Sequence, residues 1–250
     1  MSRIFLIGEN TVISTEEGRD INTEFGMIPS KKLKGKRIGS VVKTHKGIPF
    51  VIINPSVSDL FKKFIRSPQI ITLKDLGSII SYTGMDSSSK VLDAGTGSGF
   101  AACVFASIAK KVVSYEIRED FAKIAEKNKL LFNARNLKII NKDIGEGVKE
   151  KDFDILLLDL PEPQKIIPKI ENNVKIGGYI VCYLPSAIQV EKLLRSIPDN
   201  IKVVKLLQNL EIPWKNDVKA DILRPESSAI LHTAFVIIMR RYPSASKKSL

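Results

Sequence analysis

The stretch Lys90-Val-Leu-Asp-Ala-Gly-Thr-Gly-Ser-Gly-Phe100 decides the fold of this 250-residue chain. A short apolar segment leads to Asp93, glycines follow at positions 95, 97 and 99, and an apolar run continues over residues 101–109. This order predicts a strand, a tight turn and a helix. Glycines at such a turn permit positive φ and let a ligand approach the main chain, and the amides that open the helix then face that ligand. We therefore expect a ligand site at this turn.

The spacing of the glycines distinguishes among nucleotide sites. The dinucleotide fingerprint is Gly-x-Gly-x-x-Gly, and a phosphate-binding loop ends in Gly-Lys-Ser/Thr, whereas here the glycines alternate and Gly99-Phe100-Ala101 contains no lysine. The pattern Asp-x-Gly-x-Gly-x-Gly resembles the first motif of the S-adenosyl-L-methionine-dependent methyltransferases. That resemblance implies that Asp93 serves the methionine end of S-adenosyl-L-methionine and that the glycines admit the cofactor.

Four acidic residues, Asp93, Glu116, Asp143 and Asp159, each lie at or just past the end of a different predicted strand. A single acid at such a place is more often a cap or a turn former. In a doubly wound sheet, however, the carboxyl ends of the strands meet at one edge, and ligands bind there. We expect Glu116 to bind both ribose hydroxyls of an adenosine ligand and Asp143 to accept a hydrogen bond from the adenine amine.

The rest of the chain predicts two domains, a small β-rich domain over residues 1–66 and a Rossmann-like domain over residues 67–250. The second domain alternates helices and strands, which predicts an α/β fold with a mostly parallel seven-stranded sheet. The strands are expected at 90–94, 111–116, 137–140, 153–159, 179–184, 203–207 and 232–239, with Gly177-Gly178 as a turn and 211–228 as a connection. Helices are expected at 74–82, 100–110, 118–132, 166–174 and 187–196.

The net charge of +12 and the pI of about 9.6 make a polyanionic partner plausible. Seven Lys or Arg and no acid lie between Lys31 and Lys46. This run is either a solvated loop or a face that contacts phosphates. Cys103 and Cys182 stand singly in apolar runs, so we interpret both as buried small hydrophobes and expect no metal site. Without an apolar run near 18 residues or a leader-like N-terminus, we expect a soluble, cytoplasmic protein that does not bind a membrane.

The segment Asp159-Leu-Pro-Glu-Pro163 makes a more specific resemblance. It resembles the fourth motif of the TrmI-type tRNA (adenine-N1)-methyltransferases, and further stretches agree with that family: Pro68-Gln-Ile-Ile-Thr-Leu-Lys-Asp75, Leu92–Gly99, Arg224-Pro225, His232-Thr-Ala-Phe235 and Arg240-Arg241. The resemblance implies a homotetrameric, RNA-binding enzyme that methylates N1 of adenine in the T-loop of tRNA, at position 58 alone or at both 57 and 58. It covers the chain from about residue 65 to the end.

The resemblance also implies a set of site residues. Asp159 is the catalytic candidate, because its carboxylate can bond the N6 amine of the target adenine as positive charge grows on the ring. The cofactor-binding candidates are Gln69, Asp93, Gly95, Thr96, Gly97, Ser98, Gly99, Glu116, Ile117, Asp143, Ile144 and Asp159. The substrate-binding candidates are Thr72, Pro161, Tyr183, His232 and Arg224.

Three positions depart from the family pattern. Members usually carry an aromatic residue where Thr72 stands, a tryptophan where Gln164 stands and a glycine where Leu231 stands. The side chain that stacks on the target base therefore stays open among Tyr183, Trp214 and His232.

Two other functions stay open at this point. One is a small-molecule methyltransferase of the corrinoid type, which would not explain the basic N-terminal domain. The other is a non-catalytic RNA-binding subunit that retains the fold, although an intact set of Asp93, Gly95, Gly97, Glu116 and Asp159 argues against a lost site. Equilibrium binding of S-adenosylhomocysteine separates a retained cofactor pocket from a lost one.

Overall fold

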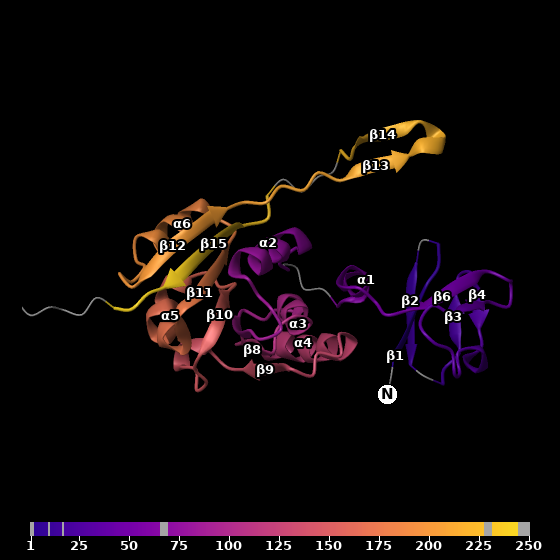
Figure 1. The fold of residues 1–250 in the computed structure, drawn as a ribbon, viewed down its shortest axis with the longest axis horizontal. Helices are drawn as coiled ribbons and strands as arrows, with labels where there is room; N and C mark the ends of the chain where they lie inside the picture. Colours follow the sequence, from indigo (N-terminus) through magenta and orange to yellow (C-terminus); the bar gives the residue numbers. More distant parts are fainter. Residues whose placement is uncertain (1–2, 10, 17, 66–69, 228–231, 245–250) are drawn as a thin grey trace, which may run out of the picture. The chain divides into compact units, whose positions relative to one another are not determined.

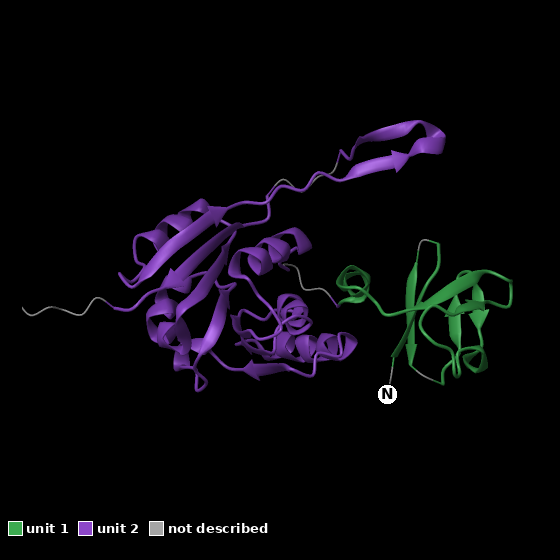
Figure 2. Ribbon diagram, in the orientation of Figure 1, with its two compact units in different colours: residues 1–64 green, residues 65–250 purple. Residues whose placement is uncertain are grey.

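The computed structural model describes residues 3–9, 11–16, 18–65, 70–227 and 232–244. The chain divides into two compact units, residues 1–64 and 65–250 (Figure 2). The division into domains of residues 1–66 and 67–250 that we expect from the sequence stays a prediction. Each unit is described below by itself.

Unit 1 is built on an antiparallel sheet with the strand order β2-β1-β6-β5, and a two-stranded β3-β4 pair accompanies it. Burial alternates along β4 and β6, and Leu6, Ile28 and Phe50 belong to a buried core. A serine–aspartate capping box at Ser56 and Asp59 begins the helix α1. The elements are β1 (Arg3–Ile7), β2 (Val12–Glu16), β3 (Ile21–Thr23), β4 (Gly26–Ile28), η1 (Ser30–Lys32), β5 (Val41–Lys43), β6 (Pro49–Ile53) and α1 (Val57–Lys63).

Unit 2 contains a seven-stranded sheet with the order β12-β15-β11-β10-β7-β8-β9 (Figure 1). Neighbouring strands are parallel except at β15, which runs antiparallel to both β11 and β12. The predicted Rossmann-like α/β fold is confirmed. The strands are β7 (Lys90–Ala94), β8 (Lys111–Glu116), β9 (Leu137–Asn141), β10 (Phe153–Leu158), β11 (Val174–Leu184), β12 (Ile201–Leu207) and β15 (Phe235–Arg241).

Consecutive residues of the central strand β10, from Ile155 to Leu158, are all buried, which shows that helices cover both faces of the sheet. Burial on both faces is the reason why this strand reads as a continuous apolar run. The α-helices are α2 (Leu73–Thr83), α3 (Phe100–Ala106), α4 (Glu119–Leu131), α5 (Pro163–Ile170) and α6 (Ala187–Leu194). The short 3-10 helices, labelled η, are η2 (Ile144–Glu146) and η3 (Glu171–Asn173). None of the described helices is long and apolar enough to cross a membrane.

The sequence prediction was wrong at Gly177-Gly178, which we expected to be a turn between a helix and a strand. Strand β11 instead runs through both glycines, and the helix before it ends at Ile170. Phe153 pairs with Val174 and Ile155 pairs with Tyr179, so β11 carries three more residues than β10 over this interval. Gly177 has a φ of +82°, and a Cβ on Gly178 would meet Val174 Cγ1 at 2.7 Å. The glycines therefore allow an irregularity within the strand.

The described residues 208–227 and 232–234, which we call the arm, lie between β12 and β15 in the sequence and include a two-stranded hairpin of β13 (Trp214–Asp217) and β14 (Ile222–Pro225), joined by η4 (Val218–Ala220). In Figure 1 the hairpin projects away from the seven-stranded sheet of its unit. Every residue of both hairpin strands is exposed. The expected connection over 211–228 thus contains regular structure that no short-range pattern in the sequence indicated.

Candidate active site

The glycine loop that follows β7 is held in a conformation that only glycine adopts readily. Gly95, Gly97 and Gly99 have φ values of +87°, +54° and +85°. The amides of Gly95 and Thr96 donate to the carbonyl oxygen of Tyr115 on β8, at 3.0 and 3.2 Å. A Cβ on Gly95 would meet the backbone oxygen of Asp159 at 2.1 Å. Position 95 therefore admits no side chain.

Two of the predicted acids lie under this loop. Asp93 and Glu116 are 2% and 4% exposed. Asp93 accepts a hydrogen bond from Ser114 Oγ. Glu116 accepts from the Gly97 amide at 2.7 Å and from the Arg118 amide at 3.0 Å. Glu116 thus holds the glycine loop as well as facing the cavity, a role that the sequence prediction did not include.

Asp159 lies beside the glycine loop because it follows β10, which pairs in parallel with β7 so that Leu158 is opposite Ala94. Its amide donates to the carbonyl oxygen of Ala94 at 2.9 Å, while its own carbonyl oxygen lies against Gly95. The backbone of Asp159 is therefore fixed on both sides by the strand that leads into the glycine loop.

A cavity of about 520 Å³ opens over these residues. Its walls are formed by the glycine loop, the ends of β7, β8, β10 and β11, and the starts of α3 and α4. The lining residues are Ile70, Ile71, Asp93, Gly95, Thr96, Gly97, Ser98, Phe100, Ala101, Glu116, Ile117, Arg118, Phe121, Asp159, Leu160, Pro161, Tyr183, Pro185 and Gln189.

A smaller cavity of about 240 Å³ adjoins the first and shares Gly95, Glu116, Ile117, Leu160 and Pro161 with it. It is also lined by Asp143, which immediately precedes η2, and by Ile144, the first residue of η2. Asp143 accepts a hydrogen bond from the Gly145 amide at 2.7 Å. The two cavities therefore meet at the glycine loop and Glu116, and Asp143 lies in the smaller one.

The electrostatics of the larger cavity favour a cationic ligand. Burial raises the pKa of Asp93 to about 7, against the lowering effect of the Ser114 hydrogen bond, and the charge of Glu116 raises it further. Burial also raises the pKa of Asp159 to about 7, and the charges of Asp93 and Glu116 add to that rise. A positive charge placed among these carboxylates would relieve their mutual repulsion.

The residues present fit S-adenosyl-L-methionine, whose sulfonium and ammonium groups are both cationic. Ser98 Oγ is buried and has no hydrogen-bond partner among the described residues, so it is free to bond a polar group of a ligand. The main chain at Gly95, which carries no side chain, and the buried carboxylates of Asp93 and Glu116 together line the site. No group of three or more His, Cys, Asp or Glu placed to hold a metal ion occurs in the described part of the chain.

Most of the predicted site residues meet at the two cavities. The members that line one or both are Asp93, Gly95, Thr96, Gly97, Ser98, Glu116, Ile117, Asp143, Ile144, Asp159, Pro161 and Tyr183. Gly99 lies behind the loop, where a Cβ would meet Ala125 Cβ at 2.9 Å. Gln69 lies outside the described residues.

Three predicted substrate-binding residues do not line either cavity. Thr72 Oγ1 donates to Asp75 at 2.9 Å. His232 is exposed, with Nε2 2.8 Å from the carbonyl oxygen of Pro185, and its ring packs on Phe235. Arg224 lies on the exposed strand β14, opposite Lys215.

Sequence reasoning missed several lining residues because it searched for acids and glycines. Arg118 places its guanidinium 3.6 Å from the ring centroid of Phe121 beside Ile117. Gln189 Nε2 donates to the carbonyl oxygen of Pro161 at 3.1 Å. Phe100 and Phe121 belong to helices whose apolar stripes predicted only packing. Their proximity to the strand ends was the one signal that could have identified them.

Comparison with known proteins places the chain among methyltransferases. Residues 85–227 match a family model described as a methyltransferase domain. The chain is 30% identical to the tRNA (adenine(57)-N(1)/adenine(58)-N(1))-methyltransferase TrmI of Methanocaldococcus jannaschii, over 88% of each chain.

Two solved structures are similar over almost the whole chain. One is an S-adenosylmethionine-dependent O-methyltransferase from Thermotoga maritima, with a TM-score of 0.80, 29% identity and coverage of 97% of this chain and 93% of that one. The other is the tRNA (m1A58) methyltransferase TrmI from Aquifex aeolicus, with a TM-score of 0.77, 25% identity and coverage of 97% and 98%.

The raised pKa of Asp159 predicts a pH-dependent effect of Asp159→Asn on stability. Because the folded pKa of about 7 lies above the ordinary aspartate value of 3.8, the folded state binds the proton more tightly, and this group's contribution to the free energy of unfolding falls as pH rises between those values. At pH 8 the amide avoids the buried charge. Urea unfolding should therefore show Asp159→Asn to be more stabilising at pH 8 than at pH 5, by about 1 kcal/mol or more.

The control for this measurement is Asp199→Asn, which neutralises an exposed acid of the same unit. It should change the free energy of unfolding equally at the two pH values. An Asp159→Asn effect that is also equal at pH 5 and pH 8 would contradict the raised pKa.

Proposed function

The chain belongs to the TrmI family of tRNA (adenine-N1)-methyltransferases, and on that premise we propose that it methylates N1 of adenine 58 in the T-loop of tRNA, in the cytoplasm. S-adenosyl-L-methionine is the methyl donor. The M. jannaschii relative is named for positions 57 and 58, so adenine 57 is included as a second target. The observation that supports this function best is Asp159, held by its backbone at the wall of a cavity that also contains the glycine loop.

The cofactor supplies a methyl group on a sulfonium centre. We assign the methionine end to Asp93 and the glycine loop, the ribose to Glu116, and the adenine to the smaller cavity with Ile117, Asp143 and Ile144. Gln69, Thr96 and Ser98 stay in the proposed binding set. Burial of Asp93 and Glu116 orients their carboxylates before the ligand arrives, which reduces the entropy lost on binding.

The chemistry at the target base needs alignment more than proton abstraction. N1 of adenine has a free lone pair at neutral pH, so no strong base is required. Positive charge grows on the ring as the methyl group transfers, and a fixed carboxylate near the N6 amine stabilises that charge. We propose that Asp159 is this acceptor. The stiff segment Leu160-Pro-Glu-Pro163 keeps it in place, and Tyr183 and Pro161 form the adjacent wall.

The first test is Asp159→Ala assayed on unmodified tRNA transcript with labelled cofactor. Removing the acceptor of the developing charge should lower kcat by about 100- to 1,000-fold. S-adenosylhomocysteine should still bind, because Asp93, Glu116 and the glycine loop are untouched. Digestion of the product and nucleoside analysis should identify 1-methyladenosine in the wild-type reaction, and mapping should place it at position 58, or at 57 and 58.

Asp199→Ala is the matched control, since it removes an exposed acid that does not line the cavity, and it should keep wild-type turnover. Full activity of Asp159→Ala would refute the role given to Asp159. Wild-type protein that binds S-adenosylhomocysteine but methylates no tRNA would refute the proposed substrate.

A folded tRNA must give up a stacked base to the pocket, so contacts outside the pocket have to hold the RNA. The basic run of unit 1 is suited to this task. Lys31, Lys32, Lys34, Lys36, Arg37, Lys43 and Lys46 are all exposed, while Leu33 between them is buried and fixes the segment to the core. We propose that this run, called the basic loop, contacts tRNA phosphates.

Replacing Lys34, Lys36 and Arg37 together with Glu tests the basic loop. The KM for tRNA should rise about tenfold or more and the salt dependence of binding should weaken, because fewer counterions are released. The affinity for S-adenosylhomocysteine serves as the control and should not change. An unaltered KM for tRNA over a range of salt concentrations would show that the basic loop is solvated surface only.

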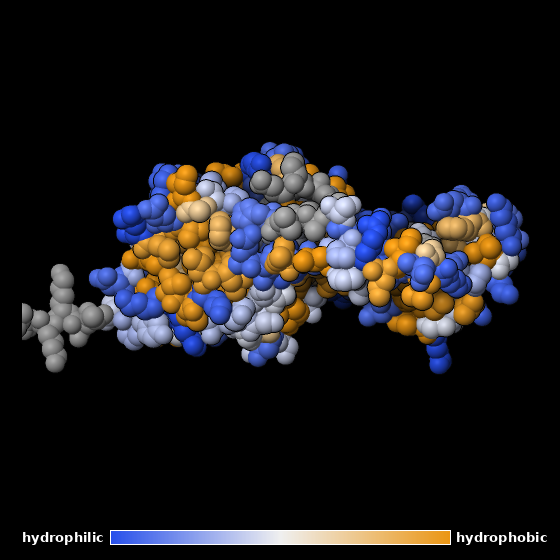
Figure 3. Space-filling model, turned by 90° about the horizontal axis from the view of Figure 1, so that it is seen from above, coloured by the Kyte–Doolittle hydropathy of each residue, from blue (hydrophilic) through white to orange (hydrophobic). Residues whose placement is uncertain are grey.

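We also propose that the protein assembles as a homotetramer through an apolar strip along the edge strand β12 and the arm. The strip contains Val203, Val204, Leu206, Leu210, Ile212, Trp214, Val218 and Leu223, which are 40% to 81% exposed. Figure 3 shows a hydrophobic area on unit 2 at the left of the view. An unpaired strand edge with apolar side chains is a surface that a second copy of the chain can cover.

The apolar strip predicts that Trp214→Lys combined with Leu223→Lys lowers the oligomeric state. Sedimentation velocity should show a tetramer for the wild-type protein and a smaller species for the double variant, because each lysine must then be desolvated at the interface. Leu130→Lys is the control, since Leu130 is 78% exposed on α4, outside the strip. A wild-type monomer at micromolar concentration would exclude the homotetramer.

A further inference from the structure

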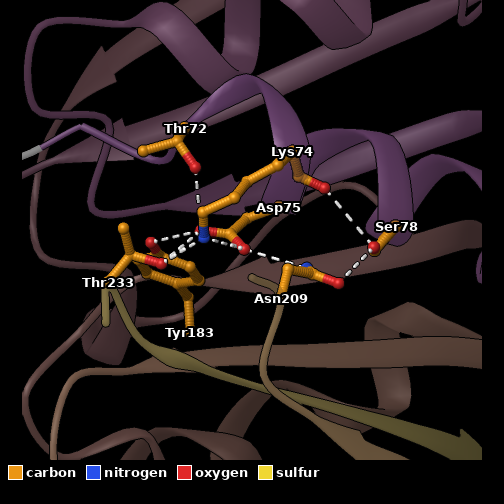
Figure 4. A network of polar contacts seen from close by, with 7 residues as sticks. All are labelled: Thr72, Lys74, Asp75, Ser78, Tyr183, Asn209 and Thr233. Carbon is orange, nitrogen blue, oxygen red and sulfur yellow. Dashed lines mark hydrogen bonds and ion pairs between the residues drawn. The ribbon is translucent and has the colours of Figure 1, made fainter. Parts of the chain in front are cut away.

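A second buried carboxylate, Asp75, lies outside the set of acids assigned to the cofactor. It belongs to the first turn of α2, and its side chain is fully buried. Figure 4 shows the polar side chains that converge on it. Oδ2 accepts hydrogen bonds from Thr72 Oγ1 at 2.9 Å, Tyr183 Oη at 2.9 Å and Thr233 Oγ1 at 2.7 Å. Oδ1 accepts from Lys74 Nζ at 3.0 Å and Asn209 Nδ2 at 2.9 Å.

This network is complete in hydrogen-bonding terms. Burial alone would raise the pKa of Asp75, but hydrogen bonds from Asn209, Thr233, Lys74 and Tyr183 outweigh it and lower that pKa below its ordinary value. Lys74 Nζ, which pairs with the carboxylate, also donates to Thr233 Oγ1 at 2.7 Å. An ionised carboxylate with five donors is rigid, because each oxygen is held from several directions.

Three of the five donors come from parts of the chain that are distant in sequence. Asn209 follows β12 and Thr233 precedes β15, so the two ends of the arm are bonded to the same carboxylate. Ser78 Oγ on α2 strengthens one end, since it donates to Asn209 Oδ1 at 2.9 Å. Asp75 thus fixes the place where the arm leaves and re-enters unit 2.

The remaining donor, Tyr183, is the only one of the five that lines the larger cavity. It lies near the end of β11 and is 8% exposed, and the charge of Asp159 is among the causes that raise its pKa, after burial and Asp75. Because its hydroxyl is committed to Asp75, the ring cannot rotate away from the cavity wall without losing a charge-assisted hydrogen bond. The position of the ring is therefore set by a residue that does not itself line the cavity.

We propose that Asp75 is a positioning residue for the methyl transfer: it holds the Tyr183 ring against the target base beside Asp159, and it does so from the anchor of the arm. This inference rests on the proposed function. It identifies a role for the Lys74-Asp75 pair that is separate from cofactor binding. Removing a group that only stabilises the fold would not lower kcat in particular, whereas removing a positioning group lowers kcat.

The test compares Asp75→Asn, Tyr183→Phe and the double variant in tRNA methylation. Asp75→Asn should lower kcat about 10- to 100-fold while the KM for S-adenosyl-L-methionine changes less than about threefold, because a misplaced base slows the chemical step and leaves the cofactor walls intact. Tyr183→Phe, which deletes only the hydroxyl that Asp75 holds, should lower kcat in the same way. The double variant should be no slower than the slower single variant by more than about twofold, since both changes break one interaction.

Asp154→Asn is the matched control. Asp154 is another carboxylate of unit 2 that binds two donors, the Lys90 amide at 2.8 Å and Lys175 Nζ, near the opposite ends of the strands. It should lower the unfolding temperature without lowering kcat. A folded Asp75→Asn protein with wild-type kcat, or a double variant whose losses multiply fully, would overturn the positioning role.

If Asp75→Asn does not fold, Tyr183→Phe decides, because unchanged kcat in that variant would show that the bond to Asp75 is not needed. The wild-type reaction run in parallel separates this inference from the proposed function. Wild-type protein that fails to methylate tRNA overturns both. An active wild-type protein with a fully active Asp75→Asn variant overturns the positioning role alone.

Discussion

The contact between the glycine loop and the backbone of Asp159 is the constraint on which the active site depends. Strands β7 and β10 are neighbours, so the loops that follow them leave the sheet side by side. The carbonyl oxygen of Asp159 occupies the space where any side chain at position 95 would lie. Asp159 can therefore lie where it does only because residue 95 is glycine, and the cavity depends on this close approach of the two loops.

The sequence predicted this part of the molecule well because short-range rules govern it. The glycine spacing and the apolar strands placed Asp93, Glu116, Asp143 and Asp159 at one edge of the sheet, and the structure brings all four to the two cavities. The carboxyl ends of parallel strands all lie at that edge, so the residues that follow the strands are placed close together. The Rossmann-like fold follows from the same alternation of elements.

The sequence failed where the outcome depended on contacts between distant segments. The network around Asp75 was not expected, because three of its donors, Tyr183, Asn209 and Thr233, are more than 100 positions away in the sequence. Gly177-Gly178 has the composition of a turn, yet the pairing of β11 with β10 and β15 extends the strand through both glycines. The hairpin of the arm lies on no core, so no burial pattern marked its strands.

The buried acids differ in how fully the protein itself satisfies them: Asp75 on one side, Asp93 and Asp159 on the other. Asp75 is fully buried and keeps a lowered pKa because five donors of the protein satisfy it. Asp93 and Asp159 have raised pKa values, since the one side-chain donor to Asp93, Ser114, does not offset burial and the neighbouring charges. Burial is common to both groups, so burial alone does not identify a functional acid. What separates Asp93 and Asp159 from Asp75 is the deficit of donors, because a ligand that brings positive charge or N–H groups gains most where the protein has supplied least.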